Sequence, residues 1–190
     1  MRTLKISKVD AAQQQVDTAI QLFFDDGDPV SIHTLLYAAH DIIHGLHKRV
    51  TGKPLFFDND AVKSIPGLIR IIKDWPNFFK HGRPYELDRT LEFNPECNLV
   101  FFSACITGLD SVRASRSDLQ HAVVYWLFIH HPEYFPAESL KHRPSGELLK
   151  QGKRLGKKAF LQTYIRGRRR RARGKPARVG EPPATCYGAT

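Results

Sequence analysis

The chain has 190 residues, of which 42% are hydrophobic and 11% aromatic, a composition that excludes a wholly disordered protein and suits one domain with appendages. Its net charge of +10 is unevenly distributed. Residues 1–136 hold 14 Lys/Arg and 16 Asp/Glu (net −2), whereas residues 137–190 hold 15 and 3 (net +12). The first part is therefore near neutral and the last part strongly basic.

The sequence is not typical of a membrane-spanning, secreted or disulfide-stabilised protein. The longest apolar run, residues 122–129, is far shorter than the roughly 18 residues of a membrane span, and residues 1–10 contain no apolar signal region. The three cysteines, Cys97, Cys105 and Cys186, form no C-x-x-C pair. We therefore expect no membrane association, no disulfide framework and a cytoplasmic location.

Apolar residues at helical spacing predict the first two helices. Asp10 and Gln13 resemble a capping box that opens a helix over residues 10–25. Asp28 followed by Pro29 is typical of an N-cap and first helical position, and predicts a helix over residues 29–49 that ends at Gly52. Residues 55–57 form a short apolar link to the next segment.

Three further helical segments follow. Residues 58–60 supply a cap for a third helix, which Pro66 and Pro76 should break or kink. Asn94 and the proline after it open a largely apolar helix that should end at Gly108. A capping box that begins at Ser117 opens another apolar helix over residues 118–131.

The C-terminal third is predicted to be less regular. Residues 137–165 allow one long basic helix or two short ones, broken at 144–146. Residues 166–190 are rich in arginine and then in Gly and Pro, and should be disordered alone. We therefore predict an all-α protein: a bundle of five or six helices over 1–136 with its basic C-terminal extension.

The arginines of this extension predict contact with a polyanion. Six of them could neutralise successive phosphates of RNA or another nucleic acid, with little dependence on base sequence. A solubilising extension is the alternative interpretation. The six candidate nucleic-acid-binding residues are Arg166, Arg168, Arg169, Arg170, Arg171 and Arg173.

Four histidines, the first being His33, follow one stripe of the predicted 29–49 helix. His40, His44 and His47 could ligate a metal ion, because neutral imidazoles at i, i+4 can bind the same metal ion and helical bundles build such sites in their cores. No Glu accompanies them, so the alternative is that their rings pack on the core and form hydrogen bonds outward. We expect no cofactor, and keep a metal-dependent enzyme as a second hypothesis.

The stretch 74–82, Asp-Trp-Pro-Asn-Phe-Phe-Lys-His-Gly, combines apolar anchors with a polar trio. Asn77, Lys80 and His81 within it resemble the Asn-x-x-Lys-His variant of the motif in HEPN-type helical bundles, many of which cleave RNA while others only bind nucleotides. The resemblance implies that His81 is the base for a ribose 2′-hydroxyl, Lys80 the stabilising cation and Asn77 the residue that orients the imidazole. The family usually has an arginine before the Asn, where this chain has Pro76.

The leading hypothesis is therefore a HEPN-like protein that engages nucleic acid, with ribonuclease activity left open. A third interpretation is a structural protein in which the apolar helices 94–108 and 118–131 serve a subunit contact, such as that of a homodimer. Burial within one chain and burial between chains give the same sequence pattern.

Overall fold

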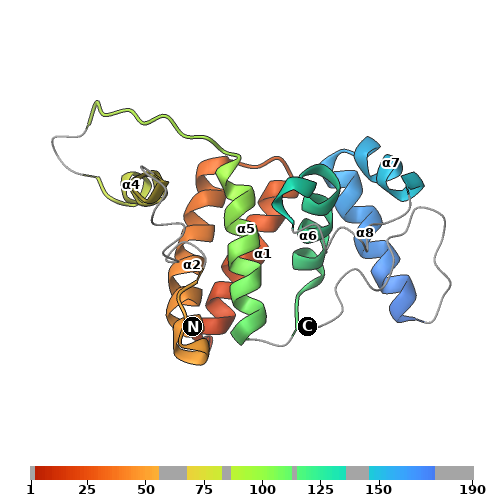
Figure 1. Cartoon of the computed structure of the whole chain (residues 1–190), viewed down its shortest axis with the longest axis horizontal. Helices are drawn as coiled ribbons and strands as arrows, with labels where there is room; N and C mark the ends of the chain where they lie inside the picture. The colour runs from red at the N-terminus through yellow and green to blue at the C-terminus, as the bar shows by residue number, and fades with distance from the viewer. Residues whose placement is uncertain (1–2, 56–67, 83–86, 113–114, 136–145, 174–190) are drawn as a thin grey trace. The chain divides into compact units, whose positions relative to one another are not determined.

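The computed structural model describes residues 3–55, 68–82, 87–112, 115–135 and 146–173, and every element of regular structure in them is helical (Figure 1). The prediction of an all-α protein is confirmed. The elements are α1 (Lys8–Phe24), α2 (Pro29–Thr51), α4 (Leu68–Lys80), α5 (Cys97–Val112), α6 (Asp118–His130), the 3-10 turn η3 (Pro132–Tyr134), α7 (Gly146–Arg154) and α8 (Lys157–Ala172).

The chain forms two compact units. The first contains residues 1–23 and 27–116, and the second contains residues 24–26 and 117–190. The division falls between Arg116 and Ser117, whereas the sequence placed the end of the bundle at residue 136. The difference arises because α6 packs against α7 and α8, and so belongs with the basic C-terminal segment.

Local capping explains where the first helices begin and end. The α1 helix begins before Asp10, because the Ser7 hydroxyl accepts from the Asp10 amide (3.1 Å) and Asp10 Oδ2 accepts from the Ser7 amide (3.3 Å). This reciprocal pair lies one turn before the predicted box at Asp10 and Gln13, because α1 begins at Lys8. The predicted cap of α2 is confirmed, since Asp28 Oδ2 accepts from the Ser31 amide at 2.7 Å. The helix ends at Gly52, whose φ of 71° is left-handed.

The α5 helix continues past Gly108 to Val112, so the predicted stop at Gly108 is wrong. This glycine is a packing residue, because a Cβ there would lie 2.3 Å from Ile43 Cγ2 on α2 and 3.0 Å from Leu55 Cδ1. The absence of a side chain lets α2 and α5 approach closely, and these two helices form the largest helix contact in the first unit. Phe23 of α1 adds an edge-to-face contact with Phe102 of α5 at 5.5 Å.

The second unit is built around α6, in which every residue from Ala122 to Ile129 is buried. Gly152 brings α7 close to α6, since a Cβ there would lie 2.6 Å from Ile129 Cδ1. Phe160 of α8 packs edge-to-face on Trp126 of α6 at 5.0 Å. The described part of the basic segment is two helices, separated at residues 155–156. The predicted break at 144–146 falls at the start of α7, and its residues 144–145 lie outside the described residues.

The α8 helix extends to Ala172, so the prediction that residues 166–172 are disordered is wrong. Residues 174–190 of the predicted tail lie outside the described residues, as do the link at 56–57, the cap at 58–60 and Pro66. Pro76 lies inside α4. None of the described helices is long and apolar enough to cross a bilayer.

Candidate functional site

The polar trio of the 74–82 stretch does not form a shared constellation with the residues that the structure describes. Asn77 and His81 are exposed at the end of α4, joined through the backbone by the His81 amide donating to the Asn77 carbonyl at 3.0 Å. Lys80 places its ammonium 4.2 Å from the centroid of the Tyr37 ring on α2. That cation–π contact attaches the end of α4 to α2.

The aromatic residues of the same stretch surround a histidine instead. His33 of α2 is fully buried, and the nearest of its ring neighbours, Phe101, lies 5.0 Å away between centroids. All of these neighbours meet the imidazole edge-to-face at 5.0–6.0 Å: Trp75, Phe79, Phe93 and Phe101. The 74–82 stretch therefore supplies Trp75 and Phe79, two of the four rings that enclose His33, which we call the aromatic cover. These contacts agree with the apolar anchoring role that the sequence suggested.

The tautomer of His33 follows from its hydrogen bonds. Asn98 Nδ2 donates to the Pro29 carbonyl at 3.1 Å, which turns Asn98 Oδ1 toward His33 Nδ1 at 2.8 Å. Since an amide oxygen only accepts, Nδ1 carries the proton and Nε2 keeps a lone pair. Nε2 is buried and has no hydrogen-bond partner among the described residues.

Burial lowers the pKa of His33 below its ordinary value of 6.5, and the nearby charge of Lys80 lowers that pKa further. The hydrogen bond to Asn98 acts in the opposite direction but does not cancel the effect of burial. The imidazole is therefore neutral at pH 7. Cys97 lies beside it, with Sγ 3.7 Å from His33 Nδ1, and burial raises the pKa of this thiol to about 12. The pair is thus unsuited to thiolate chemistry near neutral pH.

The other histidines of α2 serve separate contacts. His44 Nδ1 accepts from the Leu55 amide at 3.4 Å, and His47 Nδ1 lies 2.7 Å from the Ser111 hydroxyl on α5. His40 is buried and stacks on His44 with centroids 6.2 Å apart. Among the described residues, no group of three or more His, Cys, Asp or Glu side chains is arranged to hold a metal ion. The contacts favour packing and helix docking over the metal hypothesis.

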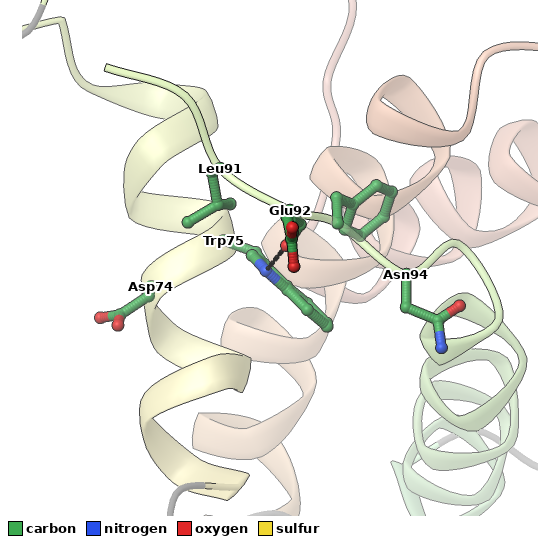
Figure 2. A pocket seen from close by; sticks show the side chains of 6 residues that line it. Asp74, Trp75, Leu91, Glu92 and Asn94 are labelled. Atoms are coloured by element: carbon green, nitrogen blue, oxygen red, sulfur yellow. Dashed lines mark hydrogen bonds between the residues drawn. The ribbon is translucent and has the colours of Figure 1, made fainter.

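An open surface pocket of about 550 Å³ lies beside the aromatic cover. Figure 2 shows the Trp75 indole between α4 and the extended segment that follows residue 90, where its Nε1–H donates to the Glu92 carbonyl at 3.0 Å. The Asp74 carboxylate points away from the indole (Figure 2). The lining residues are Asp74, Trp75, Leu91, Glu92, Phe93 and Asn94.

The α8 helix carries the densest positive charge of the described residues, and its sequence contains no Asp or Glu. Its inner face is apolar, since Phe160, Leu161 and Tyr164 are buried. Tyr164 lies 5.5 Å from the Tyr125 ring of α6. These contacts determine which side of α8 faces outward.

The outward side presents a row of cations, which we call the α8 basic row. Its exposed members fall within an arc of about 80°, because successive residues turn by about 100° around a helix. Gln162 occupies the same arc and is also exposed. The row consists of Lys158, Arg166 and Arg169 on the helix and Arg173 in the turn after it.

The six predicted arginines therefore separate into groups. Arg166, Arg169 and Arg173 belong to the row, whereas Arg168 lies outside its arc and its Nε donates to Asp118 Oδ1 at 2.8 Å. Arg170 is half-buried. For Arg171 only the backbone is described.

Lys158 was missed by the sequence analysis because it precedes the arginine run, although its spacing of 4, 4, 3 and 4 residues through Gln162 to Arg173 is a readable signal. A second set of exposed cations, Lys150, Lys153 and Arg154, lies on α7. The second unit therefore exposes cations on both α7 and α8.

The fold and its surface define an all-helical protein with a basic helix face. Comparison of the chain with protein-family models, with curated proteins and with solved structures finds no match.

Proposed function

We propose that this protein binds nucleic acid through the α8 basic row. The observation that carries the proposal is the row itself: three exposed cations on one side of a helix that has no acidic residue, and a fourth in the turn after it. Arg166, Arg169 and Arg173 follow one another at spacings of three and four residues, which places helix side chains about 5–6 Å apart, close enough to contact neighbouring phosphates of one polyanion. Lys158 lies eight residues before Arg166 on the same side and extends the row. Lys158, Arg166, Arg169 and Arg173 are the residues to which we assign this contact.

Two features support nucleic acid as the partner. Arg side chains form paired hydrogen bonds with phosphate oxygens, and three of the four cations are Arg. The close spacing of Arg166, Arg169 and Arg173 also creates like-charge repulsion, which a bound polyanion would relieve. We place this function in the cytoplasm because Cys97 and Cys105 are free thiols.

The HEPN resemblance stays a prediction, and we do not include cleavage in the proposal. The proposed function is binding, and it does not depend on His81. RNA and DNA both supply the phosphates that the row requires.

The test is fluorescence anisotropy with a labelled nucleic acid of 20 base pairs between 50 and 200 mM salt. For four phosphate contacts the slope of log K against log salt should be about −3.6, so affinity should fall about a hundredfold over this range. The variant R166Q/R169Q/R173Q should reduce the magnitude of that slope by about 3.

The matched control removes three exposed cations from the first unit, in K48Q/R49Q/K53Q, and changes the net charge by the same amount. It should retain the wild-type slope. Equal loss of binding in the two variants would show that only net charge matters, and would overturn the assignment to α8. Circular dichroism of both variants confirms that the helices are intact.

A further inference from the structure

We infer that the α8 basic row is built for a double-stranded nucleic acid rather than a single strand. This inference rests on the proposed function and specifies its partner. It depends on three properties of the row: which side chains are exposed on it, how rigidly it is held, and how long it is.

The exposed face of α8 lacks the side chains that bind unpaired bases. Proteins that bind single strands combine cations with aromatic rings on which the bases stack, each contributing about 1–3 kcal/mol. The two aromatic residues of α8, Phe160 and Tyr164, are both buried against α6. Among the helix residues whose side chains are described, the exposed ones are Lys158, Ala159, Gln162, Thr163, Arg166, Arg169 and Ala172, none of which is aromatic.

The row is also held in a fixed register on its unit. The ion pair between Arg168 and Asp118 at 2.8 Å ties the C-terminal half of α8 to the start of α6. A second ion pair, between Lys157 and Asp26 at 2.8 Å, holds its first residue. Phe160 stacks on Phe24 with ring centroids 5.9 Å apart, and Phe24 belongs to residues 24–26, the same short segment of the second unit that contains Asp26.

A fixed row of cations favours a partner whose phosphates are already fixed. A duplex is stiff over about 150 base pairs and carries one charge per about 1.7 Å of its axis. Lys158 and Arg173 are separated by about 22 Å along a helix, a length over which such a duplex offers more phosphates than the row has cations. A flexible single strand must instead be ordered to match the row, and it gains no stacking in return.

The inference predicts different affinities for two forms of one nucleic acid. Labelled RNA and DNA of 20 nucleotides are titrated with the full chain at 100 mM salt, as single strands and as duplexes of the same sequence. We expect each duplex to bind at least tenfold more tightly than its single strand. The salt slope per contact should be near −0.9 for the duplex and near −0.7 for the single strand.

The variant R166Q/R169Q/R173Q identifies the source of the preference. It should lose most of the duplex preference, while K48Q/R49Q/K53Q should keep it. A preference that survives in R166Q/R169Q/R173Q would overturn the inference, because the preference would then arise elsewhere in the chain.

The remaining outcomes separate the inference from the proposed function. If single strands bind as tightly as duplexes, or more tightly, the duplex inference is overturned while nucleic-acid binding stands. If neither form binds, both fail. Binding to phosphatidylserine vesicles without binding to either nucleic acid would also overturn both, since the row would then be a membrane-surface contact.

Discussion

His33 and Asn98 are joined across α2 and α5 by a 2.8 Å hydrogen bond between Nδ1 and Oδ1, although 65 residues separate them in sequence. Both side chains are buried, and the second polar group of the Asn98 amide is used by the Pro29 carbonyl. The bond therefore connects the two helices that form the largest contact of the first unit, inside a cluster of aromatic rings.

The first prediction concerns the cost of breaking this bond. Asn98→Ala leaves the buried His33 Nδ1–H without its acceptor, and we expect a loss of about 1–3 kcal/mol in the free energy of unfolding. Urea denaturation followed by circular dichroism measures it. Asn77→Ala, at an exposed position, should change the free energy by less than about 0.5 kcal/mol. Equal stability of the two variants would contradict the proposed role of Asn98.

The second prediction concerns pH. Since burial lowers the folded-state pKa of His33 below the unfolded value near 6.5, the unfolded chain binds the proton first as pH falls. The stability associated with neutral His33 is therefore present above pH 6.5 and is lost as pH falls from there through the folded-state pKa.

Urea midpoints at pH 7.5 and 5.5 test this dependence. The wild-type midpoint should fall at pH 5.5, and His33→Gln should show a smaller fall because Gln does not titrate. His81→Gln, at an exposed position, should show the same fall as wild type. A fall in His33→Gln as large as that of wild type would assign the pH dependence to other groups.

The sequence predicted helix ends correctly where residues close in sequence determine the cap. Asp28 with Pro29 and Ser117 with Gln120 are caps whose donors and acceptors lie within three residues, and both form as predicted. The C-cap at Gly52 is equally local. These elements needed no knowledge of the tertiary fold.

Long-range contacts explain what the sequence could not show. The arginine run after residue 165 reads as disordered by composition, yet it continues α8, because Phe160 and Tyr164 pack on α6 and Arg168 pairs with Asp118 50 residues away. Similarly, the four histidines of α2 share a stripe in sequence, but the hydrogen-bond partners of His33 and His47 come from α5 and that of His44 comes from the segment after α2, while His40 stacks on His44. A one-dimensional stripe cannot distinguish convergence on a metal from separate contacts.

Gly108 provides the third prediction, because a glycine can end a helix or allow close packing. In Gly108→Ala the new methyl would lie 2.3 Å from Ile43 Cγ2, a branched group with little freedom to move. We expect a net loss of about 1–3 kcal/mol in the free energy of unfolding despite the better helix propensity of Ala.

Gly152→Ala is the matched variant for this test. The nearest atom there is Ile129 Cδ1 at 2.6 Å, the terminal methyl of a side chain that can rotate away. The propensity gain of up to about 1 kcal/mol should offset the contact, so this variant should be close to wild type in urea denaturation. Comparable destabilisation of the two variants would show that side-chain freedom does not decide the cost.

The last prediction concerns the Asn77–His81 motif. A general base must be held within hydrogen-bond reach of the proton that it removes. The His81 side chain is exposed and makes no hydrogen bond, ion pair or ring contact with the described residues, while Lys80 contacts the Tyr37 ring. We therefore expect the protein to bind RNA without cleaving it. Labelled single-stranded RNA incubated with the protein in EDTA should stay intact, and His81→Ala should leave binding unchanged. Metal-independent cleavage that His81→Ala abolishes, with the helical spectrum intact, would contradict this prediction and support the chemistry that the HEPN resemblance implies.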